Sequence, residues 1–267
     1  MKTINELMSL QGRRALITGA AGKIGHQVAI TFAELGADLV LVDRPGQNFD
    51  ELLAMLEKIG NINIECIESD LEDGNARTEL INHLLSQDEV LNILVNNAAF
   101  VGEPNLDGWI TGLENQSIEA WRREIEVNLT AAFDLAKGLY PKLRQDKNGS
   151  IINVASIYAV SAPDYSLYEG TEMGNNASYA ASKGGLVQLT RWLSTTLAPD
   201  VRVNVISPGG VFRNQPVEFV KRYEAKTPLG RMATEEDFKG AVAYLGSDLS
   251  GYVTGQNLLI DGGWTVW

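Results

Sequence analysis

Residues 14–25 read Arg-Ala-Leu-Ile-Thr-Gly-Ala-Ala-Gly-Lys-Ile-Gly, and this stretch decides the fold. A short apolar run leads into three glycines, and the apolar spacing of a helix follows them. Glycines at such a junction let backbone N–H groups approach a pyrophosphate, which also lies at the positive end of the helix dipole. Because glycine serves plain tight turns as well, its position after a strand carries the signal. The candidate contacts of a dinucleotide here are Gly19, Gly22, Lys23, Ile24 and Gly25.

The rest of the chain repeats this order of strand and helix. The expected strands are rich in β-branched residues or Leu and buried on both faces: Arg14–Thr18, Asp38–Val42, Ile62–Ile67, Asn92–Asn96, Ser150–Val154, Val201–Ile206 and Asn257–Ile260. The expected helices are Ile24–Leu35, Glu51–Ile59, Arg77–Ser86, Ile118–Tyr140, Tyr179–Leu197 and Glu235–Leu245. We therefore predict an α/β fold, a three-layer Rossmann-type doubly wound parallel sheet of about seven strands. No linker divides the chain, so we expect one domain over residues 1–267.

Three segments depart from this alternation: Val101–Ser117, Ile157–Ser178 and Gly209–Thr227. They are rich in Gly, Asn, acids or aromatics, and they show no clear period. Long irregular loops are uncommon in a compact domain and are often functional. We therefore expect these three segments to border a site.

Composition excludes several classes of protein. The chain has 267 residues, of which 45% are hydrophobic and 21% charged, as in an average globular domain. A net charge of −12 disfavours nucleic acid as a partner. One cysteine, Cys66, and two histidines provide neither a disulfide nor a metal-ligand set. Without a signal peptide or a long apolar run, we expect a cytoplasmic protein with no membrane contact.

Asp43 closes the second expected strand, where an acid can accept both hydroxyl hydrogen bonds of an adenosine ribose and repel a 2′-phosphate. This position favours NAD over NADP, although the cations Lys23 and Arg44 oppose that preference. The alternative is a solvated aspartate in a turn. Asp70, followed by Leu71, is placed to accept from the adenine amino group, and as a plain helix N-cap it would look the same.

Tyr179 and Lys183 stand at positions i and i+4 of an expected helix, so they are neighbours on one face. A cation so close stabilises tyrosinate and lowers the tyrosine pKa towards the working range of an acid or a base. A chance surface pair would show the same spacing. Other motifs must therefore decide between the two.

Several motifs accompany this pair in a fixed order. They are Asn96-Asn97-Ala98-Ala99, Asn128, Asn153-Val154-Ala155-Ser156, Val203-Asn204-Val205-Ile206-Ser207-Pro208-Gly209-Gly210, Thr254-Gly255-Gln256 and Asp261-Gly262-Gly263. The whole set resembles the short-chain dehydrogenase/reductase family, single-domain branch, over nearly the entire chain. The resemblance implies a hydride transfer between NAD(H) and a carbonyl or secondary alcohol. It also implies a homo-oligomer, most simply a tetramer, through the long helices.

The same resemblance assigns roles to single residues. Tyr179 would be the proton donor or acceptor, and Lys183 its pKa-lowering partner that also holds the nicotinamide ribose. Ser156 would steady the substrate oxygen, and Asn128 would hold a helix kink and a water of the proton relay. The implied contacts of the adenosine are Asn97, Ala98 and Ala99, and those of the nicotinamide are Pro208, Gly209 and Val211.

Two features depart from the family pattern. The glycine spacing Thr-Gly-x-x-Gly-x-x-Gly resembles the extended, sugar-nucleotide-modifying branch, whereas the short chain after Lys183 and its Gly-rich ending fit the single-domain branch. Arg213 stands where many members have a threonine that contacts the nicotinamide end. Two alternatives therefore stay open, an epimerase or dehydratase that uses NAD transiently and a dinucleotide-binding sensor without turnover.

The segment Ile157–Ser178 is longer than the resembled family usually has between the serine and the tyrosine. Its aromatic faces and carboxylates suit a sugar-derived or polyol substrate, through Tyr158, Asp164, Tyr165, Tyr168 and Glu169. The alternative is a subunit-contact loop. Cations on the facing segment could meet a phosphate or carboxylate, or form a solvated helix face: Arg213, Lys221, Arg222 and Lys226. The runs 156–173 and 209–216 resemble a bacterial subgroup linked to flagellin modification and nonulosonic acid synthesis.

Overall fold

The computed structural model describes residues 1–100, 102 and 106–267, and its centre is a seven-stranded parallel sheet. The strands are β1 (Arg14–Thr18), β2 (Asp38–Asp43), β3 (Ile64–Glu68), β4 (Ile93–Asn96), β5 (Gly149–Val154), β6 (Val201–Pro208) and β7 (Asn257–Ile260). Their order is β3-β2-β1-β4-β5-β6-β7, and every neighbouring pair is parallel. This arrangement confirms the predicted doubly wound fold, with the chain reversing its direction of winding between β1 and β4.

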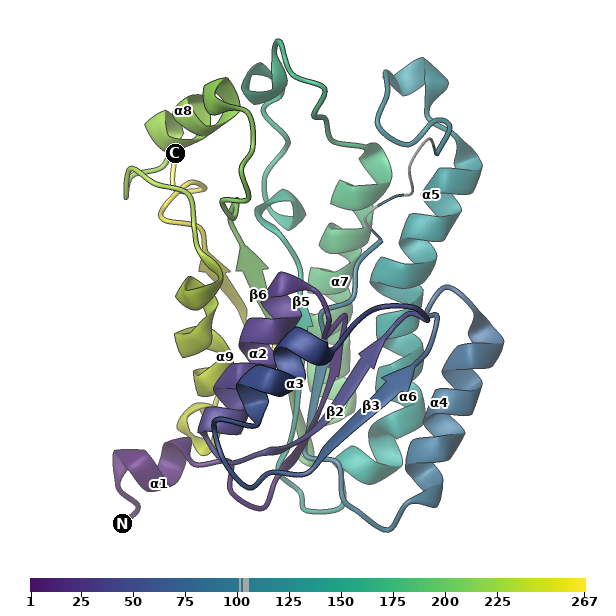
Figure 1. Cartoon of the computed structure of the whole chain (residues 1–267), viewed down its shortest axis with the longest axis vertical. Coiled ribbons are helices and arrows are strands. Elements are labelled where there is room, and N and C mark those ends of the chain that lie inside the picture. The colour runs from purple at the N-terminus through teal and green to yellow at the C-terminus, as the bar shows by residue number, and fades with distance from the viewer. Residues whose placement is uncertain (101, 103–105) are drawn as a thin grey trace.

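Helices cover both faces of the sheet (Figure 1). One face carries α2 (Lys23–Glu34), α3 (Asp50–Leu56) and α9 (Lys239–Gly246), and the other carries α4 (Gly74–Ser86), α6 (Ala131–Leu143) and α7 (Ala177–Thr196). The alternation of a strand divides the core accordingly: Ala15 and Ile17 of β1 pack in the first cluster, and Leu16 packs in the second. The three layers predicted from the sequence are therefore present.

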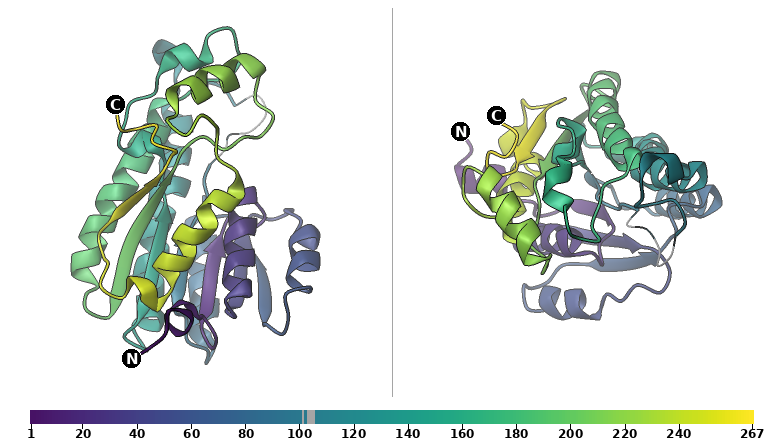
Figure 2. Two further views of the ribbon diagram at one scale, coloured as in Figure 1. Left: turned by 90° about the vertical axis from the view of Figure 1, so that its left-hand side faces the viewer. Right: turned by 90° about the horizontal axis from the view of Figure 1, so that it is seen from above.

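The carboxyl ends of the strands meet at one edge of the sheet, and the longest connections rise above it. Helix α5 (Ile118–Ile125), helix α8 (Val217–Lys226) and the segment 157–178 lie at this end, whereas the short α1 (Ile4–Met8) lies at the opposite end (Figure 2). Ligands of open α/β sheets bind outside the carboxyl ends of the strands. The fold therefore directs the search for a site to this edge.

The expected helix Ile118–Tyr140 is confirmed, with a change of helix type inside it. A π-helical turn, Glu126–Thr130, separates α5 from α6. The turn contains Asn128, whose buried side chain is hydrogen-bonded on two sides, so a local bulge places that amide inside the fold. The helix kink implied at Asn128 agrees with this geometry.

The expected irregular segment Gly209–Thr227 is wrong in its second half, where α8 forms. Phe219 and Tyr223 are buried in a cluster with Leu167 and Trp264, so packing on one face stabilises a helix whose sequence shows little period. The expected helix Glu235–Leu245 likewise begins with a 3-10 turn. Boundaries elsewhere differ by a few residues, and α1 was not expected.

Across the described residues, no helix combines the length and apolarity that a membrane crossing needs. In the same part of the chain, no three His, Cys, Asp or Glu side chains gather into a metal-binding group.

Candidate active site

The glycine loop after β1 forms a close-fitting cradle. Gly19 has φ +64°, and a Cβ there would lie 2.8 Å from the Cα of Ala98. A Cβ at Gly25 would lie 2.1 Å from the carbonyl oxygen of Gly19. Gly22 is the N-cap of α2 and offers no side-chain cap, so the first N–H groups of the helix remain free to bind an anion. The loop therefore fits a dinucleotide pyrophosphate, with Lys23 exposed beside it.

Side chains at the end of β4 brace this loop. Asn97 Nδ2 donates to the carbonyl oxygens of Thr18 and Gly19, at 2.9 Å and 3.0 Å. The Thr18 hydroxyl accepts from the backbone N–H groups of Asn97 and Ala98, each at 3.0 Å. Asn97 therefore holds the shape of the cradle, and Ala99 is half-buried next to it.

Asp43 stands at the end of β2 with its carboxylate fixed by the backbone. Its Oδ2 accepts from Ala21 N at 2.9 Å, and its Oδ1 accepts from Arg44 N at 2.8 Å. Since the remaining lone pairs lie at the rim of the cradle, the carboxylate suits ribose hydroxyls.

Asp70 does not cap the next helix, because Asp73 is the N-cap of α4. Asp70 accepts instead from Glu72 N at 3.0 Å in a local turn. It is exposed, and Leu71 beside it is buried. The helix-cap alternative for Asp70 is therefore wrong.

Three of the four candidate catalytic residues converge beyond β5. Tyr179 and Lys183 lie one turn apart on α7, and Lys183 Nζ is 5.8 Å from the centroid of the Tyr179 ring. Lys183 Nζ donates to the carbonyl oxygen of Val154 at 2.8 Å. Ser156 follows that strand, and its hydroxyl acts to lower the pKa of Tyr179. A hydroxyl, a phenol and an ammonium are thus held in one place.

Asn128 lies behind this group and links two elements to it. Its Oδ1 accepts from Phe100 N at 2.8 Å, and its Nδ2 donates to the Ser182 hydroxyl at 3.1 Å. Ser182 lies next to Lys183 on α7. The amide therefore fixes the distance between the π-helical turn and the helix that carries the tyrosine and the lysine.

The electrostatics of the pair are governed by burial. Burial raises the pKa of Tyr179, while the Ser156 hydroxyl and the charge of Arg213 oppose that rise. The structure thus shows the opposite of the expected direction for Tyr179. Burial also lowers the pKa of Lys183 to about 8, against the charge of Glu124. Both groups are pushed towards their neutral forms, although the Tyr179 side chain keeps partial access to solvent.

This geometry agrees with a comparison of the whole sequence. A family model described as "Enoyl-(Acyl carrier protein) reductase" matches residues 19–265. The chain belongs to the short-chain dehydrogenase/reductase family.

Individual relatives of this short-chain dehydrogenase cover nearly its full length. An NADP-dependent mannitol dehydrogenase of Alternaria alternata is 29% identical, over 98% of this chain and 96% of that protein. The structure of a gluconate 5-dehydrogenase from Burkholderia cenocepacia, in complex with NADP and tartrate, has a TM-score of 0.85 at 26% identity, covering 99% and 100% of the two chains. A short-chain dehydrogenase from Leptospira borgpetersenii with bound NAD⁺ has a TM-score of 0.83 at 33% identity, covering 99% and 96%.

On the far side of the site, β6 ends at Pro208 and the chain turns tightly. Gly209 N donates to Ile260 O at 2.9 Å, and a Cβ at Gly209 would lie 2.8 Å from the Cα of Asp261. Val211 pairs with Ala233 in an isolated bridge. This close packing fixes the turn after β6 against Ile260 and Asp261.

Arg213 is exposed on the following loop, where its Nε lies 3.3 Å from Glu235 Oε1. Its charge opposes the rise in the Tyr179 pKa that burial causes.

The segment 157–178 forms a wall beside Tyr179. The hydroxyls of Tyr158 and Tyr168 are 2.8 Å apart, and the Tyr158 ring meets Tyr179 edge to face with centroids 6.5 Å apart. Tyr165 and Glu169 are exposed at the outer side.

Two cations of α8 bind residues of this wall. Arg222 donates to the carbonyl oxygens of Leu167 and Glu169, and Lys226 pairs with Asp164. Lys221 is exposed and pairs with Glu218 on its own helix. Arg222 and Lys226 therefore attach α8 to the wall, and neither matches the solvated-face alternative.

One residue of this region does not appear among the sequence candidates. Glu124 on α5 is 0% exposed and accepts hydrogen bonds from Ser178 and Asn176. A glutamate in a helix rich in charge resembles a solvent-facing residue. Its position four residues after buried Ala120 and four before Asn128 is the signal that places it on the buried face.

Proposed function

We propose that the chain is an NAD(H)-dependent dehydrogenase that acts on a secondary alcohol, or on the matching carbonyl, of a polyhydroxylated small molecule. One domain, residues 1–267, would hold both the cofactor and the substrate. The observation that carries this proposal is the convergence of Ser156, Tyr179 and Lys183 beyond β5, next to the glycine cradle. The chemistry fits the family's oxidoreductases.

The chain's own residues have separable roles. When bound, NAD(P) supplies the hydride acceptor or donor. In the direction of oxidation, Ser156 and Tyr179 would hold the substrate hydroxyl, and the Tyr179 phenolate would take its proton. Lys183 would stabilise that phenolate, and Asn128 would keep α7 in register with the π-helical turn. In the direction of reduction the phenol gives the proton back.

Asp43 supports NAD over NADP, because its fixed carboxylate would repel a 2′-phosphate. The exposed Lys23 and Arg44 act in the other direction. Both cofactors occur among similar proteins, since one solved structure holds NADP and another holds NAD⁺. We expect this chain to prefer NAD, and kinetics with both cofactors test that expectation.

Three observations support a sugar-derived substrate. The wall of segment 157–178 presents tyrosine hydroxyls beside Tyr179. Relatives are named for mannitol and gluconate, both polyhydroxylated. The resemblance of residues 156–173 and 209–216 to the flagellin-modification subgroup favours a nonulosonic acid precursor within this class.

The expected homo-tetramer is part of the same proposal. Helices α5, α6 and α7 carry large apolar side chains that are exposed in the single chain: Ile118, Trp121, Phe133 and Trp192. A second copy would cover them. Light scattering at micromolar concentration should show a species several times the 29.1 kDa chain mass, and a monomer would contradict this part. The single cysteine supports a reducing, cytoplasmic location.

The test of the function is absorbance of the reduced cofactor across a panel of polyols, aldonic acids and hydrophobic alcohols, with NAD⁺ and NADP⁺ in parallel. Net formation of NADH with a polyol supports the proposal. Product without net NADH would indicate the epimerase alternative. Cofactor binding without any product would indicate the sensor. A clear preference for hydrophobic alcohols would contradict the substrate class alone.

A further inference from the structure

Glu124 is a buried acid that takes no part in the mechanism proposed above for Ser156, Tyr179 and Lys183. It lies on α5, four residues before Asn128, and its side chain is fully buried. A carboxylate removed from water is costly unless hydrogen bonds or an opposite charge compensate it. Its partners therefore show what it does.

One oxygen of Glu124 fixes the beginning of α7. Its Oε2 accepts from the Ser178 hydroxyl at 2.5 Å and from Asn176 Nδ2 at 2.7 Å. Asn176 is the N-cap of α7, and Ser178 directly precedes Tyr179. Since both bonds cross from α5, the carboxylate ties the first turn of the catalytic helix to its neighbour.

The second carboxylate oxygen of Glu124, Oε1, acts on its surroundings through its charge. Glu124 Oε1 and Trp109 Nε1 are buried, and among the described residues neither has a partner in ordinary hydrogen-bond geometry. Burial raises the pKa of Glu124, and the Trp109 indole and the charge of Lys183 oppose that rise. Within the same residues, Lys183 forms no ion pair and donates only to Val154 O. Glu124 is thus the acid whose charge Lys183 experiences.

We propose that Glu124 is a positioning residue for the catalytic pair: its carboxylate holds the first turn of α7 and supplies the buried counter-charge of the Lys183 ammonium. The proposal rests on the roles proposed above for Tyr179 and Lys183. Glu124 acts through them and touches neither substrate nor cofactor.

The sign of its electrostatic effect follows from the charges that face the pair. Three groups act electrostatically on Tyr179: Glu124 of α5, Arg213 of the loop after β6, and Tyr168 of the wall segment. The Tyr158 ring of the same segment packs edge to face against the Tyr179 ring. A negative charge at Glu124 raises the pKa of both Tyr179 and Lys183. Removing it should therefore let both groups lose their protons at lower pH.

The first experiment needs no substrate. Tyrosinate absorbance is titrated in the wild type and in Tyr179→Phe, and the difference gives the step that belongs to Tyr179. The same difference is then taken in the Glu124→Gln background. We expect the step to move to lower pH by about half to one unit. A step that stays in place would overturn the proposal, whether or not any substrate of the enzyme has been found.

Two further variants separate charge from packing. Glu119→Gln removes the same charge from an exposed position on α5 and should leave the Tyr179 step unmoved. Glu124→Asp keeps the charge on a shorter side chain, so the step should stay close to that of the wild type even if the folded state is less stable. Equal shifts in Glu119→Gln and Glu124→Gln would mean a general charge effect and would refute a specific role.

Kinetics with the best substrate of the panel supply the second readout. In Glu124→Gln the pH profile of kcat/KM should move to lower pH as a whole, because the macroscopic pKa values belong to the Tyr179–Lys183 pair. At neutral pH a Lys183 pKa that has fallen below about 8 leaves less ammonium. A fall in kcat at every pH without a shift of the profile would show a structural role only.

Discussion

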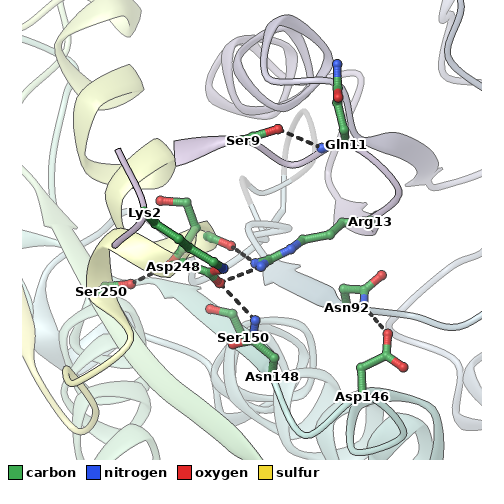
Figure 3. A network of polar contacts seen from close by, with 12 residues as sticks. Lys2, Ser9, Gln11, Arg13, Asn92, Asp146, Asn148, Ser150, Asp248 and Ser250 are labelled. Carbon is green, nitrogen blue, oxygen red and sulfur yellow. Dashed lines mark hydrogen bonds and ion pairs between the residues drawn. The ribbon is translucent and has the colours of Figure 1, made fainter. Parts of the chain in front are cut away.

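At the two edges of the sheet, the pKa values of two carboxyl groups, Asp248 and Glu124, are shifted in opposite directions. At the amino ends of the strands, the Asp248 carboxylate accepts hydrogen bonds from the side chains of Arg13, Lys2 and Asn148 (Figure 3). Burial raises the pKa of Asp248, but the hydrogen bonds from these three side chains outweigh it and leave the pKa well below the ordinary value. At the carboxyl ends, burial raises the pKa of Glu124 despite its two donors.

This difference separates stability from function. The Asp248 carboxylate is hydrogen-bonded to three side chains, and these bonds link the turn after α9 to the N-terminal residues and to the segment before β5. Its hydrogen bonds therefore serve the stability of the fold. The carboxyl edge keeps groups that are buried and have few hydrogen-bond partners, among them Lys183 and Glu124. Perturbed titratable groups in such a place are typical of functional sites. Changes at the two edges should therefore separate activity from folding.

The largest effect is expected at the carboxyl edge, from Tyr179→Phe. The phenol is needed for proton transfer and not for the fold, so turnover should fall by about 10² to 10⁴ while the melting temperature and cofactor affinity stay near those of the wild type. Steady-state kinetics, thermal melting and cofactor titration measure the three quantities. Retention of more than about a hundredth of the activity would mean that another residue is the acid.

The sequence predicted the first elements of this edge because their signals are local. A strand, glycines and a helix in residues 14–25 predict the cradle, and Tyr179 with Lys183 predicts a shared helical face. The sequence analysis did not predict the buried Glu124 or helix α8, because both depend on tertiary packing. Glu124 becomes special only when α5 meets the start of α7, and α8 forms because Phe219 finds an apolar cluster. The spacing of Glu124 from Ala120 and Asn128 indicates a buried face, but it does not show what covers that face.

The opposite edge supplies the second prediction. Asp248→Asn should lower the free energy of unfolding by about 2 to 3 kcal/mol, since it leaves the half-buried Arg13 without its counter-charge. Activity per folded molecule should not change. Chemical denaturation and kinetics on the same sample measure both. Asp88→Asn, an exposed change on the loop before β4, is the matched control and should alter neither.

The contribution of Asp248 also has a defined dependence on pH. Its pKa in the folded state lies below the ordinary value of 3.8, so its stabilisation is complete above that value and disappears as the pH falls through the folded pKa. The difference in stability between the wild type and Asp248→Asn should therefore be constant from neutral pH down to mild acidity and shrink below it. A difference that grew on acidification would contradict the assignment.

A smaller effect is expected from Asp43→Ala at the rim of the cradle. Loss of a charged acceptor of the ribose hydroxyls should weaken NAD⁺ binding about tenfold. NADP⁺ should lose less or gain, because the repulsion of its 2′-phosphate disappears. Kinetics with both cofactors give the ratio. If the unmodified protein already used NADP⁺ equally well or better, Asp43 would not set the preference.

The smallest effect should come from the wall segment. Tyr168→Phe removes the hydroxyl that lies 2.8 Å from that of Tyr158, and a lost hydrogen bond of this kind costs about 1 kcal/mol. Tyr158 contacts the Tyr179 ring directly, so its freed hydroxyl would turn towards the substrate space and change KM for polyols several-fold. Tyr244→Phe is the matched control, because that phenol lies on α9, away from the wall. Cofactor affinity should be the same in both variants, because neither Tyr168 nor Tyr244 belongs to the glycine cradle. An unchanged KM for every polyol tested would mean that the wall contacts another subunit and not the substrate.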